Sequence, residues 1–438
     1  MRNKSVEMIG ATLAVGAILS AFFGYNSHKN ERKSVCCGLA RAECMECGNF
    51  DGYSDSIFDK NVVFTANAPA EGTKKQAPLQ LFTNGKSAYV MESSSGIGVF
   101  EKEGTKRLPI ASMCKIMTLL LAFESIDEGI LSMDEEITVS QNAADMGGSQ
   151  VFLEANAKYR VSELIKSIVV CSANDSCVAL AERIAGSDSL FVDKMNEKAR
   201  ALGCENTLFA NCTGLPQEPQ YSCAKDVAKM FAELIKHEEY FTFSKIWLDS
   251  FLHPQGRTTE ITNTNRLVKF YNGCDGGKTG FTNEAGFCLA ATAKRENMRL
   301  ISVVIGEQDS KTRFKEMSES FDYTFANYTM QKVVDADANL DEKVAVCGGK
   351  TKSVSIQPAR NGYIFVKRGE KADYQTQVVL ESSISAPFEK RAKVGEIRIY
   401  RQGVACDNIP LVVTESVDKA TYGDTLKDVA GRWNLNGK

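Results

Sequence analysis

The segment Leu108-Pro-Ile-Ala-Ser-Met-Cys-Lys-Ile-Met-Thr118 decides how this chain is built, because it joins a reactive pair of residues to an apolar helix. The mostly apolar run that continues to Glu124 predicts a central, buried helix. If Ser112 opens this helix, Lys115 lies on the same face, three residues further along. Serine needs a base within hydrogen-bond reach, and lysine serves as a base only when burial or nearby positive charge lowers its pKa. The free N–H groups of a helix start can also bind a developing oxyanion.

Two further motifs follow in chain order, Ser172-Ala-Asn174 and Lys278-Thr-Gly280. Each motif is weak alone, and a lone S-x-x-K would more often be a helix cap with a surface lysine. The ordered set S-x-x-K, S-x-N and K-T-G is a strong signal for acyl transfer through a serine. In this set Lys278 can supply positive charge beside the lysine base and bind an anionic substrate.

The residues around the motifs sharpen the interpretation. The segments 108–118, 172–182 and 275–289 resemble the D-alanyl-D-alanine carboxypeptidases, the low-molecular-mass penicillin-binding proteins of serine peptidase family S11. The resemblance runs from about residue 85 to about residue 328, and more loosely to the end of the chain. It implies the β-lactamase/transpeptidase-like fold, a penicillin target, and no metal or organic cofactor.

The resemblance also implies a role for each motif residue. Ser112 would be the acylated nucleophile and Lys115 its proton acceptor, Ser172 would relay protons to the leaving group, and Asn174 would orient the substrate amide. The terminal carboxylate and the oxyanion would be bound by the K-T-G strand, which comprises Lys278, Thr279, Gly280 and Phe281. The oxyanion hole would consist of the backbone N–H groups of Ser112 and Phe281.

One position departs from the family pattern. Many members carry histidine before Gly-Leu, where this chain has Thr213. A Ser-His-Asp triad has little support, because the only histidines are His28, His237 and His253, and the last two lie in sequence typical of solvated side chains. No Glu-x-x-Leu-Asn element follows Asn174, so the sequence predicts slow deacylation of penicillin, unlike a class A β-lactamase.

Composition and the N-terminus indicate where the protein acts. The chain has 438 residues and a net charge of −3, which fits two or three domains and gives no sign of nucleic-acid binding. Basic residues precede an apolar run over 8–23 that would span roughly 24 Å as a helix, less than a bilayer core of about 30 Å. Residues 1–25 are therefore predicted to be a signal peptide, with an uncleaved membrane anchor as the alternative.

Residues 26–78 have the polar composition of a connector. The connector contains Cys36, Cys37, Cys44 and Cys47. The C-x-x-C spacing of the last two can bind zinc, but adjacent cysteines suit tetrahedral ligation poorly, so reactive or incidental thiols are the preferred interpretation.

The remaining cysteines occupy positions that a small apolar residue would suit. The chain has 14 cysteines, a number that in an exported protein usually indicates disulfides. Cys114 lies within the predicted active helix, and Cys171 and Cys177 flank the S-x-N motif. We expect buried free thiols, with a Cys171–Cys177 or a Cys204–Cys212 bridge as the alternative.

The expected fold class is α+β. Strands are predicted over 86–92, 98–101, 286–292 and 300–305, and helices over 161–171 and 175–184, which gives an antiparallel sheet with a helical cluster in a catalytic domain over 79–330. Short strands from 344 to 400 predict a small β-rich domain over 331–419. Residues 420–438 predict an amphipathic helical tail that either contacts a membrane surface or packs on its own domain.

The sequence thus predicts an exported serine-type D-Ala-D-Ala carboxypeptidase that acts through a Ser112 acyl-enzyme on the extracytoplasmic face of the membrane. Its expected partners are peptidoglycan stem peptides ending in D-Ala-D-Ala, β-lactams as covalent inhibitors, and the membrane surface. The alternatives are a D,D-endopeptidase acting on peptidoglycan crosslinks, and a non-catalytic cell-wall-binding protein that keeps the fold.

Overall fold

The computed structural model describes residues 63–65, 81–336, 338, 340–371, 373–401 and 403–435. The predicted leader, His28 and the four connector cysteines (Cys36, Cys37, Cys44 and Cys47) lie outside the described residues. Within the described part of the chain, no helix has the length and apolar character needed to cross a membrane.

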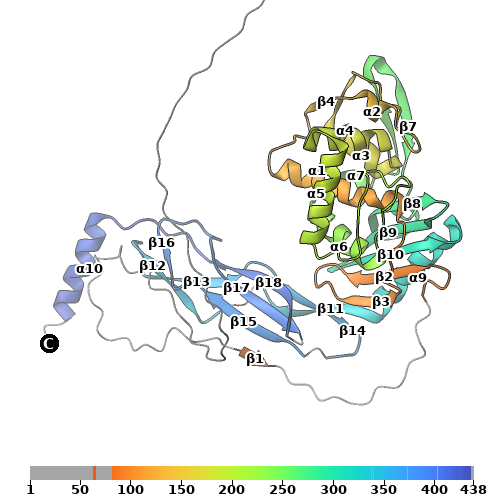
Figure 1. The fold of residues 1–438 in the computed structure, drawn as a ribbon. Helices are drawn as coiled ribbons and strands as arrows, with labels where there is room; N and C mark the ends of the chain where they lie inside the picture. The colour runs from red at the N-terminus through yellow and green to blue at the C-terminus, as the bar shows by residue number, and fades with distance from the viewer. Residues whose placement is uncertain are drawn as a thin grey trace, which may run out of the picture. The chain divides into compact units, whose positions relative to one another are not determined.

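A five-stranded antiparallel sheet forms the centre of the region that carries the motifs (Figure 1). Its strand order is β3-β2-β10-β9-β8. The predicted strand pair near residue 90 is present, and the two long strands after the K-T-G motif continue the sheet. The bounds are β2 Ser87–Glu92, β3 Gly98–Lys102, β8 Cys274–Thr282, β9 Gly286–Arg295 and β10 Met298–Glu307.

Both faces of this sheet are covered, which explains why β9 and β10 are almost continuously apolar rather than alternating. On one face Ile301 and Val303 join the core formed by α1 and α6. On the other face Val304 packs with Met317 and Phe321 of α9. The bounds of these helices are α1 Lys115–Asp127, α6 Ala224–Leu234 and α9 Ser310–Asn327.

The start of the central helix differs from the expectation. Ser112 lies in a 3-10 turn, η1 (Ala111–Cys114), and the α-helix proper begins at Lys115. The turn is tightened by the N–H of Met113, which donates to the carbonyl of Ile110 at 3.2 Å, a bond typical of 3-10 geometry. Ser112 therefore does not cap the helix, and its hydroxyl is left to contact Lys115.

The S-x-N motif lies at a sharp turn between two helices, α3 (Val161–Cys171) and α4 (Asn174–Ala185). Ser172 adopts left-handed backbone angles with a φ of 68°, and so ends α3. Gly186 ends α4 in the same conformation, as predicted.

The other elements of this region are helices, most of them short, and two hairpins. The helices are α2 Gln141–Ala144, α5 Asp188–Ala201, α7 Tyr240–Ser244, η2 Pro254–Gly256 and α8 Leu267–Phe270. The hairpins pair β4 Glu136–Thr138 with β5 Lys158–Arg160, and β6 Leu248–Leu252 with β7 Thr258–Thr262.

After α9 the chain becomes almost entirely β-structure, as predicted. A seven-stranded sheet has the order β1-β15-β17-β18-β13-β12-β16, and β11 pairs separately with β14. Its edge strand β1 was not predicted, because it lies within residues 26–78, which were expected to be a connector. The bounds are β1 Val63–Thr65, β11 Tyr328–Val334, β12 Lys343–Cys347, β13 Ser353–Pro358, β14 Gly362–Lys367, β15 Gln375–Leu380, β16 Ser383–Ser385, β17 Lys393–Arg401 and β18 Val404–Val413. Its core consists of aliphatic side chains, including Ile356, Ile397 and Ile409.

The last described element is the predicted helix, α10 (Tyr422–Leu435). Thr421 caps its start, because its hydroxyl accepts from the N–H of Asp424 while the Asp424 carboxylate accepts from the N–H of Thr421. Tyr422, Leu426 and Val429 are exposed large apolar side chains on this helix.

Candidate active site

The first motif forms a serine–lysine pair. Lys115 Nζ lies 3.0 Å from Ser112 Oγ and also donates to the carbonyl oxygen of Thr213 at 2.6 Å. The lysine is fully buried, and this burial lowers its pKa from the ordinary value. A lysine with a lowered pKa can hold the neutral form that accepts a proton from a serine.

The loop containing Thr213 holds the lysine in place. Asn211 Oδ1 accepts from the N–H groups of Thr213 and Gly214, at 3.1 and 2.7 Å. Gly214 has a φ of +80°, and a Cβ there would lie 2.1 Å from the carbonyl oxygen of Ala111. Glycine thus lets the loop reach the turn that carries Ser112. Thr213 thus contacts the base through its backbone carbonyl, a role that its side-chain type did not predict.

The second and third motifs form another serine–lysine pair. Lys278 Nζ donates to Ser172 Oγ at 2.8 Å and to the carbonyl oxygen of Thr279 at 3.2 Å. Burial first, and then the positive charge of Lys115, lower the pKa of Lys278 well below its ordinary value. The charge coupling means that the two amines disfavour simultaneous protonation. The site can therefore hold one neutral lysine and one cationic lysine.

Asn174 presents an unpaired acceptor. Its Nδ2 donates to the carbonyl oxygen of Gly147 at 2.6 Å, and its backbone N–H donates to the carbonyl oxygen of Ser149 at 2.7 Å. Its buried Oδ1 has no hydrogen-bond partner. A buried acceptor without a partner is costly, so the site is prepared for a ligand N–H at this atom.

The loop that fixes Asn174 is itself held by Asp175, a residue the sequence analysis did not select. The fully buried carboxylate of Asp175 accepts from the N–H groups of Val151 and Leu153, both at 3.1 Å, and of Ser176 at 2.9 Å. The pKa of Asp175 is raised because burial outweighs these hydrogen bonds. The only sequence signal was the Asn-Asp pair at the motif, which is too common to be specific.

Strand β8 contacts the nucleophile turn through Gly280. A Cβ at this position would lie 2.7 Å from the carbonyl oxygen of Ile110 and 3.2 Å from the backbone nitrogen of Ser112. Only glycine therefore allows the K-T-G strand to run this close to Ser112. Thr279 is buried beside Lys278, whereas the ring of Phe281 is exposed and packs on Phe287 with ring centroids 4.4 Å apart.

Arg313 adds a buried cation behind this strand. Its Nη1 donates to the carbonyl oxygens of Gly280 and Cys288, at 3.3 and 3.0 Å, and its Nη2 donates to Ser310 Oγ. Its Nε has no partner. Its charge contributes to the lowered pKa of Lys278. No sequence signal identified Arg313, since it lies outside the three motifs in the sequence, in a helix without a recognisable pattern of its own.

The two described histidines are not solvated, contrary to expectation, and neither contacts the motif residues. His253 is only 5% exposed, because its ring nitrogens contact Tyr159 Oη and Thr259 Oγ1 at 3.1 and 2.9 Å. His237 Nδ1 lies 2.9 Å from Asp127. Their polar partners lie on other elements, which the local sequence does not reveal.

The described cysteines are free thiols, including both pairs proposed as alternative bridges. Most are buried, as expected, and Cys114 Sγ donates to the carbonyl oxygen of Asn211 at 3.2 Å. Burial raises the pKa of Cys171 to about 11 and that of Cys177 to about 12, so both remain protonated at neutral pH. Cys347 is an exception to the expectation, because it is exposed.

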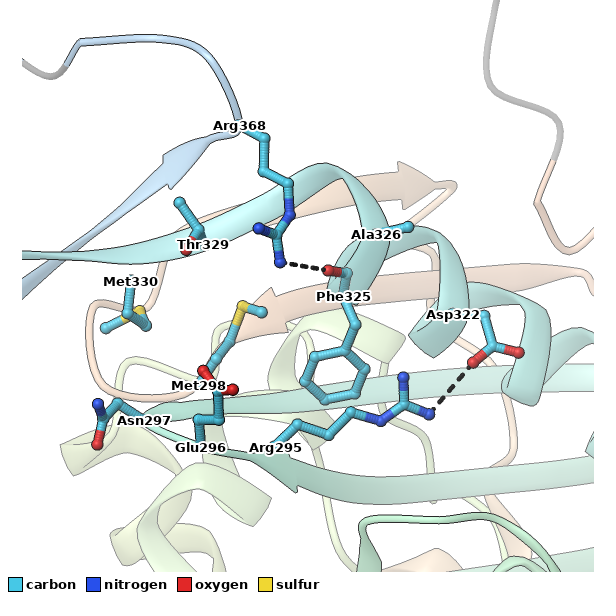
Figure 2. A pocket seen from close by; sticks show the side chains of 10 residues that line it. All are labelled: Arg295, Glu296, Asn297, Met298, Asp322, Phe325, Ala326, Thr329, Met330 and Arg368. Carbon is cyan, nitrogen blue, oxygen red and sulfur yellow. Dashed lines mark hydrogen bonds and ion pairs between the residues drawn. The ribbon is translucent and has the colours of Figure 1, made fainter.

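A separate hollow lies where the turn between β9 and β10 meets the end of α9 and the start of β11 (Figure 2). Both of its arginines are already paired, since Arg368 donates to the carbonyl oxygen of Phe325 and Arg295 contacts Asp322. None of the three motifs contributes to its lining. We assign it no catalytic role.

The pairing of a serine hydroxyl with a buried lysine, next to a second serine–lysine pair, is the arrangement of serine hydrolases that use lysine in place of histidine. The chain belongs to the family of D-alanyl-D-alanine carboxypeptidases. The model of that family, peptidase S11, matches residues 72–309, and the model of the penicillin-binding protein 5 C-terminal domain matches residues 328–419.

Several relatives match most of the chain. The D-alanyl-D-alanine carboxypeptidase DacF of Bacillus subtilis (strain 168) is 38% identical over 355 residues, which cover 81% of this chain and 91% of the relative. Penicillin-binding protein 5 of Haemophilus influenzae is 28% identical with a TM-score of 0.60, covering 79% of this chain and 100% of that one. PBP3 of Streptococcus pneumoniae, described as a peptidoglycan synthesis regulatory factor, is 26% identical with a TM-score of 0.65, covering 78% and 100%. The expected α+β fold class is confirmed.

Proposed function

We propose that this protein removes the terminal D-alanine from peptidoglycan stem pentapeptides through an acyl-enzyme on Ser112. The observation that carries the proposal is the approach of buried Lys115 Nζ to Ser112 Oγ at 3.0 Å, beside the Lys278–Ser172 contact at 2.8 Å. One pair has the geometry to activate a nucleophile. The other has the geometry to deliver a proton and hold an anion.

In acylation, neutral Lys115 accepts the Ser112 proton as Oγ attacks the carbonyl carbon of the penultimate D-alanine. The backbone N–H groups of Ser112 and Phe281 stabilise the oxyanion. The C–N bond then breaks, and the departing amine of D-alanine takes a proton relayed through Ser172. Asn174 accepts from a substrate N–H, while Lys278 and Thr279 bind the terminal carboxylate.

In deacylation, a water molecule attacks the ester carbon and gives its proton to Lys115, which releases the shortened peptide and restores the Ser112 hydroxyl. A β-lactam follows the same first step, because its strained amide presents the same carbonyl to Ser112. The chain has no Glu-x-x-Leu-Asn element after Asn174, which supports slow release of the drug.

A D,D-endopeptidase is the runner-up within the same chemistry. The buried cations Lys278 and Arg313 favour a substrate with a free terminal carboxylate, which an internal crosslink lacks at that position. The two intact serine–lysine pairs argue against a non-catalytic wall-binding protein.

The proposal also covers location and organisation. Residues 1–25 act as a signal peptide or anchor, 26–78 as a connector, 79–330 as the catalytic domain and 331–419 as a β-rich domain. The tail over 420–438 binds a membrane surface on the extracytoplasmic side. The exposed apolar side chains of α10, at Tyr422, Leu426 and Val429, support this placement.

A fluorescent penicillin tests the covalent step. The wild-type protein should take up one acyl group on Ser112, identified by mass spectrometry of the labelled peptide. Ser112→Ala should abolish labelling while the circular dichroism spectrum stays unchanged, because only the hydroxyl is removed. Labelling of a cysteine, or labelling that persists in Ser112→Ala, would contradict the mechanism.

A further inference from the structure

An exposed aromatic pair lies on the catalytic region, on residues that the proposed mechanism does not use. The ring of Phe270, at the end of α8, is 65% exposed. It meets the half-buried ring of Trp247 edge-on, with centroids 5.7 Å apart and an angle of 73° between the planes. Leu248, the next residue in the chain, is 61% exposed. Large apolar side chains gathered at a surface mark a binding site more often than scattered single ones do.

Cations flank these rings. Lys269 Nζ lies 5.1 Å from the centroid of the Trp247 ring and 5.6 Å from that of Phe270, and Arg266 Cζ lies 5.8 Å from the Phe270 centroid. Among the residues that the structure describes, no carboxylate lies within ion-pair distance of Arg266 or Lys269. We call Trp247, Arg266, Lys269 and Phe270 the aromatic–basic patch. Its charges are not neutralised from within the described chain.

Hydrogen bonds of two asparagines hold the backbone on which the patch residues lie. Asn263 Nδ2 donates to the carbonyl oxygen of Ile246 at 2.8 Å, which ties the segment before α8 to the residue before Trp247. Asn265 accepts from the N–H of Leu267 at 3.2 Å and donates to the carbonyl oxygen of Gly276 in β8 at 3.3 Å. A site held by such contacts loses little conformational entropy when it binds.

The same segment reaches the active site. The N–H of Thr264 donates to the carbonyl oxygen of Val170, two residues before Ser172, at 3.0 Å. Arg266 of the patch therefore lies two residues after Thr264, whose backbone is held at the end of α3, beside the S-x-N turn.

We propose that the aromatic–basic patch binds the peptide-bearing glycan strand of peptidoglycan, so that the enzyme prefers stem peptides attached to polymer over free peptides. This inference rests on the proposed function. The apolar faces of sugar rings stack on exposed aromatic rings, and Arg266 and Lys269 attract the carboxylates of the neighbouring stem peptides, which recur along the strand. Binding energy from this remote contact lowers the KM for polymer without altering the chemistry at Ser112.

The test compares two double variants of the full chain. Phe270→Ser/Lys269→Glu removes an exposed ring and reverses one charge in the patch. Leu190→Ser/Lys194→Glu makes the same kinds of change at exposed positions on α5 and serves as the control. Each protein is assayed for sedimentation with isolated peptidoglycan, for KM on soluble glycan strands bearing pentapeptides, and for kcat/KM on the free pentapeptide.

The patch variant should bind peptidoglycan at least about threefold more weakly and show a similar rise in KM on the strands. Its turnover of free pentapeptide and its penicillin acylation should match wild type. Unchanged sedimentation and KM would overturn the inference, as would an equal loss in the control. Patch-dependent binding to anionic phospholipid vesicles without any effect on peptidoglycan would assign the surface to the membrane instead. If wild type turns over neither substrate, the proposed function itself fails, whatever the patch does.

Discussion

At the scale of single residues, the site works by burying two amines that cannot easily be charged together. Lys115 and Lys278 are both buried, and each contacts a serine hydroxyl, at 3.0 and 2.8 Å respectively. Burial lowers the pKa of each lysine, and the charge of Lys115 lowers that of Lys278 further. A bound carboxylate would restore the charge on Lys278 and so leave Lys115 as the neutral base.

Replacing Lys278 tests whether Lys278 binds the substrate carboxylate while Lys115 acts as the base. Lys278→Ala should lower kcat/KM on a free-acid pentapeptide by about 100-fold or more, because it removes a preorganised charge from the site. A substrate with an amidated C-terminus should be poor for wild type and lose little more in the variant. Steady-state kinetics on both substrates check this. Equal turnover of the two substrates by wild type would favour an endopeptidase.

Asp175 is expected to act as a positioning residue for Asn174. Asp175→Asn weakens the hold on Val151 and Leu153 and so loosens the loop whose carbonyls bind Asn174. Penicillin acylation should slow by about tenfold or more, since small misplacements of a positioning group are costly. A substrate without the N–H that Asn174 accepts should be affected much less.

Stopped-flow acylation checks the Asp175 prediction, with Asp193→Asn, at an exposed position, as the control. If acylation slows equally for penicillin and for the substrate without that N–H, and the melting temperature falls, then Asp175 has only a structural role.

At the scale of elements, α10 has the features of a helix that binds a membrane surface reversibly. Its three exposed apolar side chains each contribute at most about 1.5–3 kcal/mol when fully buried, which supports reversible binding and not permanent anchorage. A protein that starts near Leu79 should therefore be soluble, with salt- and lipid-dependent association only.

Removing residues from Ala420 onward should abolish vesicle association and leave acylation of Ser112 unchanged. Vesicle flotation and penicillin labelling check the two parts. Detergent-requiring association of the leaderless protein would show that the tail binds more strongly than its exposed area indicates, and lost acylation would show that it supports the catalytic region.

At the scale of the whole molecule, a buried acidic pair should make stability depend on pH. Glu307, at the end of β10, is 2% exposed, and neither of its carboxyl oxygens has a hydrogen-bond donor. Burial first, and then the neighbouring Glu316 carboxylate, raise its pKa from 4.5 to about 8. The protonated folded form therefore contributes stability that is complete below about pH 4.5, declines as the pH rises, and is lost above about pH 8.

Glu307→Gln cannot ionise, so its melting temperature should exceed that of wild type by a few degrees at pH 8, with the difference vanishing near pH 4.5. Scanning calorimetry across this range checks the sign. Glu319→Gln, at an exposed position, should show no such trend. A difference that is constant with pH would mean that Glu307 does not titrate as described.

The motifs alone predicted the residues of the candidate site, and hydrophobic patterning predicted most of the elements around them. The S-x-x-K, S-x-N and K-T-G motifs identified the residues that the fold brings together, because each motif is local and its residue types are dictated by the reaction. Helix α3 has the predicted bounds, and the strands beside K-T-G form as expected, because hydrophobic periodicity and turn residues act over short distances.

The partners that complete the candidate site depend on tertiary packing. The carbonyl of Thr213 and the guanidinium of Arg313 reach the motifs from segments far away in the chain. The carboxylate of Asp175, next to the S-x-N motif, accepts from the distant N–H groups of Val151 and Leu153. Hydrogen bonds of this kind depend on how elements pack, and no local pattern encodes them. The same reason explains why His237 and His253 were wrongly expected to be solvated: burial is a property of the assembled chain, whereas chemical type is a property of the residue.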